Sequence, residues 1–205
     1  MSPLPLTPVL TEFDAPPADP MSLFRAWFDG AVEQGVREPG ALALATADAR
    51  GCASNRIVQV LGVRTTGLVF TTHAGSRKGR DLAATGWASG VLYWREIGRQ
   101  TILTGPVDPL PNAESDALWA ARPVSTHPMS VASHQSAPLP DEDALREQSL
   151  RLARAGRPLA RPAAWLGYLL TPESVEFWQA SPDRLHRRLR YERSDHGWTV
   201  ARLQP

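Results

Sequence analysis

Residues 70–100 of the chain read FTTHAGSRKGRDLAATGWASGVLYWREIGRQ, and the remaining elements can be placed around this stretch. An apolar run that ends at Phe70 predicts a buried strand, and Ser76, after a turn of small residues, is suited to cap a helix. Arg77 and Lys78 open that helix, where the dipole and the free backbone N–H groups both favour an anion. The stretch therefore predicts a phosphate-binding turn, although an ordinary capped helix with solvated charges would have the same sequence. The G-x-x-x-x-G-K-[ST] spacing of a Walker loop is absent.

The composition limits the class of protein. With 205 residues and 42% hydrophobic content, the chain can bury a core and form one domain. A net charge of +1 gives no basic field for nucleic acid. Cys52 is the only cysteine, so we expect no intramolecular disulfide and no cysteine-bound metal, and a cytoplasmic location fits best. Because no basic-then-apolar leader and no run of ~20 apolar residues is present, neither export nor a membrane span is expected.

The start of the chain differs in pattern from the rest. Residues 1–18 are rich in proline, show no apolar period and are predicted to be a flexible tail outside the core. Asp19 is suited to cap a helix, and Pro20 with the apolar stripe after it predicts a helix that ends at Gly35 and covers one face of a sheet. Residues 19–205 are therefore predicted to form a single domain.

Several short strand-like runs follow one another too closely for helices to connect them. They are predicted to pair as antiparallel hairpins in a barrel or sandwich, a mainly β (α+β) fold with flanking helices. The run Val91–Trp94 is apolar without alternation, which predicts burial on both faces, one of them against a second subunit. Further helices are predicted at 109–123, capped by Asn112, and at 141–155. The predicted strands are 41–47, 53–61, 67–72, 87–95, 100–107, 165–171, 174–178, 185–192 and 198–203.

Three motifs together resemble one protein family. THAGSRKGRDLA, WASGVLYWRE and, further on, THPMSVASHQS are similar to the flavin-binding core of the pyridoxamine 5′-phosphate oxidase family, and most similar within it to the flavin oxidases of phenazine biosynthesis. The resemblance extends from about Asp19 to the C-terminus. It implies an FMN-binding split β-barrel of antiparallel strands and a homodimer with FMN at the subunit interface. The implied activity is dehydrogenation of a di- or hexahydrophenazine carboxylate, after which O₂ reoxidises the flavin.

Two other functions stay open beside this one. The first is authentic oxidation of pyridoxamine or pyridoxine 5′-phosphate, and the second is a flavin- or haem-binding split-barrel module without turnover. Hydrolase functions are unsupported, because the sequence has no GxSxG nucleophile elbow, HExxH or paired-carboxylate motif. No metal site is expected, because His127 and His134 have no cysteine or carboxylate beside them.

The resemblance also assigns roles to individual residues. Arg56 matches the arginine of the family's R-[IV]-V-x-x-x segment, while Gln135 and Ser136 match a Q-S pair that reaches the flavin phosphate from the partner subunit. Arg184 and His186 match positions that face the substrate, and they are the catalytic candidates. The implied cofactor-binding residues are Arg56, Ile57, Val58, Gln59, Leu61, Thr71, Thr72, Ser76, Arg77, Lys78, Gln100, Gln135, Ser136, Trp178 and Arg188.

Within this set, two residues are candidates for the edge of the flavin ring. A reduced flavin carries negative charge over N1 and the adjacent carbonyl, so a cation or donor held there favours the reduced form. Arg188 and Gln100 match this edge, whereas Thr71 and Thr72 would line the ring. The residues that would hold the phosphate and ribityl end are Arg56, Arg77, Lys78, Gln135 and Ser136.

The chain departs from the vitamin enzyme at the substrate end. Leu61 stands where that enzyme has a lysine and Leu118 where it has a tyrosine, although Arg122 persists and Thr126 replaces a serine. Two leucines in place of phosphate contacts forfeit ~2–4 kcal/mol for a phosphate but add apolar wall suited to a flat, fused ring. The implied substrate-binding residues are Leu61, Leu118, Arg122, Thr126, Arg184 and His186.

Overall fold

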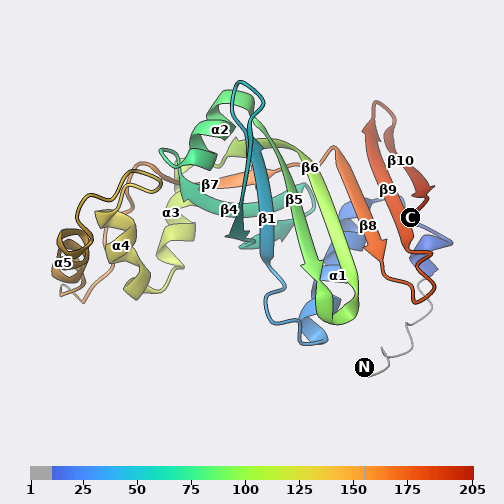
Figure 1. Cartoon of the computed structure of the whole chain (residues 1–205), viewed down its shortest axis with the longest axis horizontal. Helices are drawn as coiled ribbons and strands as arrows, with labels where there is room; N and C mark the ends of the chain where they lie inside the picture. Colours follow the sequence, from blue (N-terminus) through green and yellow to red (C-terminus); the bar gives the residue numbers. More distant parts are fainter. Residues whose placement is uncertain (1–10, 155) are drawn as a thin grey trace.

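The computed structural model describes residues 11–154 and 156–205, which form a ten-stranded sheet with helices around it (Figure 1). Each recorded strand pair is antiparallel. The strands are β1 Ala41–Ala47, β2 Ala53–Gln59, β3 Gly62–Arg64, β4 Gly67–His73, β5 Trp87–Trp94, β6 Arg99–Pro109, β7 Trp165–Leu170, β8 Ser174–Gln179, β9 Arg187–Ser194 and β10 Gly197–Leu203. The helices are η1 Thr11–Phe13, α1 Pro20–Glu33, α2 Arg77–Thr85, η2 Arg95–Ile97, α3 Asn112–Ala120, η3 Val124–Thr126, α4 His127–Ala132 and α5 Glu142–Ala153.

The sheet divides at β6. Residues Arg99–Thr104 pair with β5 on one side and β8 on the other, whereas Val107–Pro109 pair with β7. Gly105 lies at this change of partner, where a Cβ atom would come within 2.2 Å of the Thr171 carbonyl oxygen. Only glycine allows the two backbones to approach so closely. The sheet therefore runs β10-β9-β8-β6-β5-β1-β2, with β7, β4 and β3 as a branch.

The mainly β, antiparallel fold predicted from the sequence is confirmed. Each predicted strand is present with bounds shifted by a few residues, and the short β3 was not predicted. The hydrogen-bonded pairs among the described residues do not close the sheet into a ring. The split barrel therefore stays a prediction.

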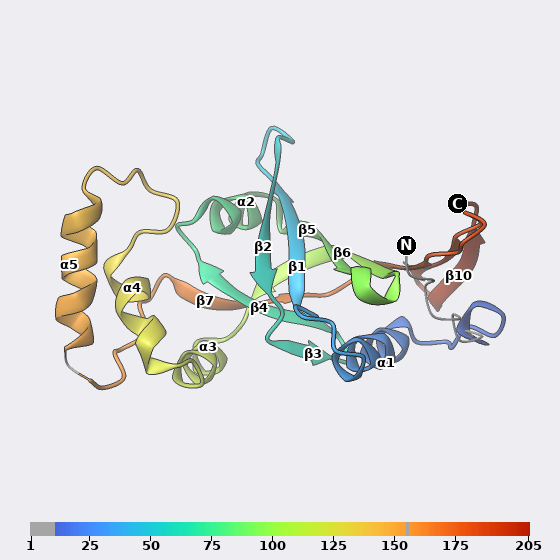
Figure 2. The ribbon, with the colours of Figure 1, turned by 60° about the horizontal axis from the view of Figure 1, so that its bottom comes forward.

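The helix α1 covers one face of the sheet, as the apolar stripe predicted (Figure 2). Asp19 caps it by accepting hydrogen bonds from the Met21 and Ser22 backbone N–H groups at 3.1 and 3.0 Å. On its buried side Trp27 meets Phe177 of β8 edge to face, with ring centroids 5.1 Å apart. Such aromatic pairs add to the hydrophobic stabilisation that already comes from burying the two rings.

The chain before α1 takes part in this core from residue 11 onward, while residues 1–10 lie outside the described residues. Phe13 is 1% exposed and packs on Trp27, whose indole N–H donates to Glu12 at 2.8 Å. The Tyr191 hydroxyl donates to the Pro17 carbonyl at 2.9 Å. The expectation that the tail lies outside the core is therefore wrong for Phe13. The same segment is held in place because it supplies hydrogen-bond acceptors for the Trp27 and Tyr191 side chains. The division into a tail of 1–18 and a domain of 19–205 stays a prediction.

The start of α3 differs from the prediction in one detail. The N-cap position belongs to Pro111 and has no side-chain capping bond, so Asn112 is the first helical residue and not the cap. The Asn112 side chain instead accepts from Arg161 at 3.2 Å. This long-range contact cannot be read from local spacing.

The outer face of the sheet, turned away from α1, is exposed in the single chain. Leu92 and Trp94 are fully buried, but Tyr93 between them is 56% exposed, so β5 is buried on one face only. The register places Tyr93 beside Gln100, which in turn lies beside Trp178. The prediction that β5 is buried on both faces is thus wrong for one chain, and the large side chains of Tyr93 and Ile57 stay exposed on this face.

Candidate active site

The start of α2 is built by a close turn after β4. Ser76 caps the helix by accepting from the Gly79 backbone N–H at 3.2 Å, and its side chain is fully buried. A Cβ atom on Gly79 would lie 2.4 Å from the Ala74 carbonyl oxygen, so glycine lets the helix rest directly on the turn. The cap is confirmed, and it places Arg77 and Lys78 in the first helical turn.

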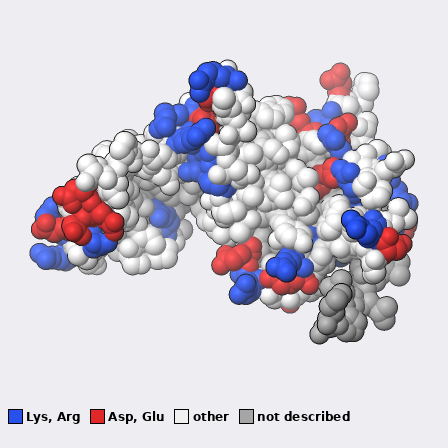
Figure 3. All heavy atoms as spheres, viewed as in Figure 1, with Lys and Arg blue, Asp and Glu red and all other residues white. Residues whose placement is uncertain are grey.

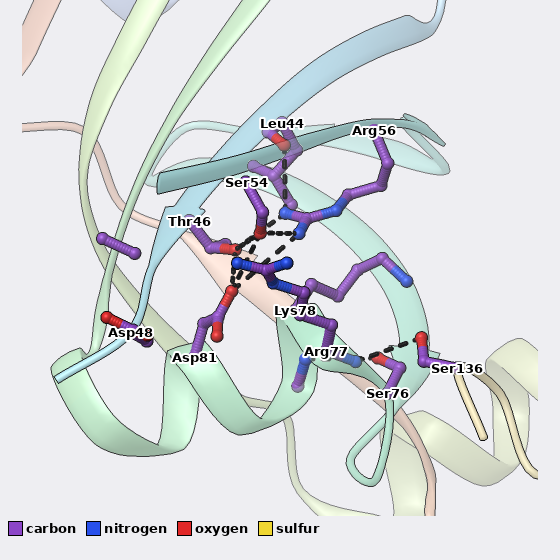
Figure 4. A network of polar contacts seen from close by, with 12 residues as sticks. Leu44, Thr46, Asp48, Ser54, Arg56, Ser76, Arg77, Lys78, Asp81 and Ser136 are labelled. Carbon is purple, nitrogen blue, oxygen red and sulfur yellow. Dashed lines mark hydrogen bonds and ion pairs between the residues drawn. The ribbon is translucent and has the colours of Figure 1, made fainter. Parts of the chain in front are cut away.

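Three basic side chains meet above this turn, and we call Arg56, Arg77 and Lys78 the cation cluster (Figure 4). Lys78 is 8% exposed, and burial together with the charge of Arg56 lowers its pKa. The pKa of Arg56 is lowered in the same way, by burial and then by Arg77, although Asp81 opposes the shift. The cations therefore act on one another, and an anion bound among them would relieve both the burial and the repulsion. Figure 3 shows that Lys and Arg side chains gather over α2 and the β1–β2 turn.

Gln135 and Ser136 reach this cluster from the same chain. The Gln135 side-chain oxygen accepts from Lys78 Nζ at 3.2 Å, and the Ser136 hydroxyl accepts from the Arg77 backbone N–H at 3.2 Å. The backbone of Ser136 is left-handed, with φ of 71°, which turns the segment after α4 back toward α2. The expectation that this pair reaches the site from a partner subunit is therefore wrong, because the loop is long enough to fold back onto its own α2.

A cavity of about 310 Å³ opens beside the cluster. Arg122 lines it, with its guanidinium carbon 5.0 Å from the Trp119 ring centroid and 5.2 Å from that of Trp165. Burial lowers the pKa of this arginine, and its Nη1 donates to the Ser130 hydroxyl at 3.1 Å. The two rings touch each other at nearly a right angle, with centroids 5.1 Å apart, so both contact the guanidinium from one side and leave it able to bind a planar carboxylate in bidentate fashion. The lining residues are Thr71, Thr72, His73, Arg122, Met129, Ser130, Ser133, Gln135 and Trp165.

His73 is a site residue that the sequence reasoning missed. It lies one residue after Thr72 in the same motif and lines the cavity, yet its imidazole makes no hydrogen bond to the residues that the structure describes. Burial lowers its pKa first, followed by the positive charge of Arg122 and Lys78 and by His134. Strand alternation could have found it, since Thr71 was already predicted to line the site and His73 points to the same side of β4.

A second group of predicted residues lies on the outer face of the sheet. Gln100, Trp178 and Arg188 stand side by side on β6, β8 and β9. The Arg188 Nε donates to Glu176 at 2.8 Å, and the His186 ring lies 4.8 Å from that of Trp178. Arg188 and His186 also line a cavity of about 470 Å³ near the C-terminus. We call this group, Gln100, Trp178, His186 and Arg188, the outer row.

The cation cluster and the outer row do not meet within one chain. Arg56 belongs to the inner set of β2 residues, whereas the outer row faces the other way. Gln100 and Pro106 are six residues apart on β6, about 20 Å along an extended strand, and Pro106 pairs with Trp87 directly after α2. α2 and the β5–β6 turn lie at opposite ends of these strands (Figure 1).

The other predicted residues lie outside both groups. Val58 points into the core at 8% exposed, so only its backbone could contact a ligand, and Ile57 is 65% exposed on the outer face beside Gln59. Leu61 is 46% exposed after β2. In the substrate set, Leu118 packs against Gly167, and the Thr126 hydroxyl donates to the Pro123 carbonyl. Arg184 is exposed with φ of 66° in the turn before β9.

The described residues contain no group of three or more His, Cys, Asp or Glu that could hold a metal ion. Among the same residues, no helix is both long and apolar enough to cross a membrane.

Two family models match the chain. Residues 28–151 match "Pyridoxamine 5'-phosphate oxidase", and residues 165–205 match "Pyridoxine 5'-phosphate oxidase C-terminal dimerisation region". A dihydrophenazinedicarboxylate synthase of Burkholderia lata is 50% identical over 95% of this chain and 92% of its own. A pyridoxine/pyridoxamine 5'-phosphate oxidase of Cupriavidus taiwanensis is 43% identical over 96% of this chain and 93% of its own.

The fold agrees with that of a solved relative. The crystal structure of PhzG from Burkholderia lata 383 in complex with tetrahydrophenazine-1-carboxylic acid superposes with a TM-score of 0.95 at 49% identity, covering 96% of this chain and 98% of that one. A pyridoxamine 5'-phosphate oxidase-related, FMN-binding protein from Nostoc punctiforme shares the fold at a TM-score of 0.74 and 19% identity, covering 89% of this chain and 97% of that one.

Proposed function

The chain belongs to the pyridoxamine 5′-phosphate oxidase family, and from that premise we propose that it is an FMN-dependent oxidase that dehydrogenates a reduced phenazine carboxylate. The observation that carries the proposal is the cation cluster at the start of α2 beside a cavity whose one arginine packs on two tryptophan rings. The relative at 50% identity is named for this chemistry. The solved relative binds a tetrahydrophenazine carboxylic acid.

The residues of the cation cluster fit the phosphate of FMN. Arg56, Arg77 and Lys78 supply positive charge, Ser136 adds a hydroxyl, and the first turn of α2 adds its dipole and N–H groups. FMN, when bound, supplies the hydride acceptor and passes the electrons to O₂. The protein holds its phosphate, and Thr71 and Thr72 are placed to line the adjoining part of the cofactor.

The outer row supports a site shared between two subunits. Within one chain it lies on the other face of the sheet from the cation cluster, so it is placed to complete the site of a partner. The exposed Tyr93 and Ile57 on the same face provide apolar surface for such a contact. The matched dimerisation region, residues 165–205, contains three members of this row. We therefore propose a homodimer with FMN at the interface.

The substrate end suits a flat carboxylate more than a phosphate ester. Arg122 can bind a carboxylate in bidentate fashion, and its contacts with the adjacent Trp119 and Trp165 rings hold it in place. Arg184 and His186 of the partner would face the substrate from the opposite side, where His186 can hold or accept a proton. In the single chain the Nδ1 of His186 accepts from the Ser181 backbone N–H at 3.1 Å, which leaves Nε2 for that role.

Absorption spectroscopy of the purified protein tests the proposal. A yellow protein should bleach under argon when a dihydrophenazine carboxylate is added and regain its colour in air. We also expect kcat/KM for pyridoxamine 5′-phosphate to be at least ~30-fold lower than for the reduced phenazine, because the side chains of Leu61 and Leu118 cannot hydrogen-bond a substrate phosphate. Comparable values would favour the vitamin activity, and stable colour with both substrates would favour a binding module without turnover. The cytoplasmic location stays a prediction.

A further inference from the structure

Asp81 is a buried acid that the proposed function does not use. It lies in the second turn of α2, is 5% exposed and faces the cation cluster from below (Figure 4). A carboxylate buried to this extent is costly unless it is paired and hydrogen-bonded. Its Oδ2 atom lies 3.9 Å from Arg56 Nη2, and this pair is too long for a hydrogen bond.

Two hydroxyl groups fill the gap between the acid and the arginine. Thr46 donates to Asp81 Oδ2 at 2.7 Å and accepts from Arg56 Nη1 at 2.7 Å. Ser54 donates to the same oxygen at 3.1 Å and accepts from Arg56 Nη2. A hydroxyl has one hydrogen, and a carboxylate only accepts, so the acid determines which way both hydroxyls point. Their lone pairs then face the guanidinium.

This arrangement leaves part of Arg56 for a ligand. Nη1 donates to the Leu44 carbonyl at 3.1 Å and to Thr46, and Nη2 donates to Ser54. A guanidinium has five N–H donors, so Nε–H and the second Nη2–H have no hydrogen bond to the described residues. These two donors lie on one edge of the guanidinium, which is the geometry that binds two oxygens of an anion.

We propose that Asp81 is the positioning residue of the cation cluster: through Thr46 and Ser54 it holds the Arg56 guanidinium with one edge turned to the cofactor phosphate. The inference rests on the proposed function, because it requires a phosphate at the cluster. Asp81 does not touch that phosphate. It lowers the positive charge of the site, and it contributes to affinity only through the orientation of Arg56.

The test compares FMN with riboflavin, which has the same ring and ribityl chain but no phosphate. Apoprotein variants are titrated with each ligand, and flavin fluorescence quenching gives the dissociation constant. Asp81→Leu removes the acceptor, and we expect FMN to bind about tenfold more weakly while riboflavin binds as in the wild type. Asp81→Asn keeps one acceptor oxygen and should restore most of the FMN affinity. Thr46→Val, which removes one of the two hydroxyls, should repeat the loss even if Asp81→Leu does not fold.

Asp48→Asn is the matched control. Asp48 also acts on Arg77 electrostatically, but its carboxylate bonds within its own turn to the Arg50 and Cys52 N–H groups, each at 2.9 Å. Removing this charge should leave FMN binding unchanged or make it tighter, because no hydroxyl is reoriented. Arg56→Met should weaken FMN binding, and adding Asp81→Leu to it should cost nothing further, since the residue being positioned is gone.

The possible results distinguish failure of the phosphate site from failure of the positioning role of Asp81. Equal FMN and riboflavin affinities in the wild type would overturn the phosphate site itself and with it the proposed function. A second result would overturn only the positioning role. In it, the wild type prefers FMN and Arg56→Met loses this preference, but Asp81→Leu and Thr46→Val bind FMN as the wild type does. Parallel loss of FMN and riboflavin in these variants would also overturn it, because general damage to the fold would then explain the effect.

Discussion

At the scale of single residues, the site is defined by cations that the fold holds in partly buried positions. Lys78 donates to the Thr72 hydroxyl at 3.1 Å and to Gln135, and its pKa is lowered by burial and by Arg56. Asp81 offsets part of the free-energy cost of confining these charges, and an anion bound among them would offset more of it. Binding affinity for an anionic cofactor is therefore the property most sensitive to single substitutions here.

Loss of one cation should weaken FMN binding without unfolding the protein. Arg77→Ala or Lys78→Ala removes a charge-assisted contact, which is expected to cost about 1.5–3 kcal/mol, or roughly tenfold to a hundredfold in affinity. Fluorescence titration measures it, with Arg151→Ala on the exposed side of α5 as the control. Wild-type affinity in both cluster variants would mean that the helix is capped but binds no phosphate.

The missed histidine predicts a pH effect on stability. Burial, Arg122, Lys78 and His134 lower the pKa of His73 below its ordinary value of 6.5, so in the window between the folded and unfolded pKa the unfolded chain binds more protons. The stability due to neutral His73 is complete above about pH 6.5 and is lost as the pH falls through the lowered pKa.

Thermal unfolding at a series of pH values checks this expectation. The Tm of the wild type should fall more steeply on acidification than that of His73→Gln, which cannot be protonated. His196→Gln, in the exposed turn between β9 and β10, should behave as the wild type does. Parallel curves for the wild type and His73→Gln would show that His73 is not held neutral by the fold.

At the scale of elements, α2 depends on how closely it can rest on the turn after β4. Gly79 lies at that contact, with the Ala74 and His73 carbonyl oxygens 2.4 and 2.5 Å from where a Cβ atom would be. Both neighbours are backbone atoms and cannot move aside as a flexible side chain would. The position of the cation cluster thus follows from a glycine that carries no charge.

Gly79→Ala should destabilise the protein, whereas helix propensity alone would predict that alanine stabilises it. Alanine is favoured over glycine within a helix by about 1 kcal/mol, but the backbone clash is expected to cost about 1–3 kcal/mol more than this gain. Gly75→Ala is the matched control, since a Cβ atom there meets nothing within 4 Å. Urea unfolding should show a lower midpoint for Gly79→Ala alone, and a raised midpoint would contradict the close packing.

At the scale of the whole molecule, the chain carries two groups of predicted site residues that face in different directions. The cation cluster lies at the start of α2, while the outer row lies on β6, β8 and β9 toward the β5–β6 turn, and Figure 1 shows that turn at the opposite end of these strands from α2. Only a second copy can bring an outer row to a cation cluster. Under the proposed function, we therefore expect activity to be a property of the dimer.

Mixed dimers should recover activity that each variant lacks. Lys78→Ala weakens FMN binding at the cation cluster and Arg188→Ala removes a side chain of the outer row. At an FMN concentration too low to fill the weakened site, a dimer with one of each has one intact site and one with both defects. Random pairing of co-expressed chains should restore about a quarter of the wild-type sites. Co-expression of Lys78→Ala with Arg77→Ala, both in the cluster, should restore none. No recovery in the first pair would place the whole site in one chain.

Much of this protein is determined by local sequence, because caps, alternation and turn residues act over a few positions. The strands, the antiparallel pairing, the α1 and α2 caps and the cations of the phosphate turn were predicted in this way. The family motifs added Arg122, Gln135 and the outer row as candidates, and the structure places Arg122 and Gln135 at one cavity of the same chain, although the motif implied that Gln135 would come from the partner.

Only the tertiary structure decided which distant groups meet. It brought Ser136 to Arg77 within one chain, placed Phe13 in the core and set Asp81 beneath Arg56 through two hydroxyls. None of these contacts has a signal in the spacing of residues, because each joins segments whose approach depends on how the whole chain packs. The sequence therefore determined which chemical groups are present, and the packing decided which of them act together.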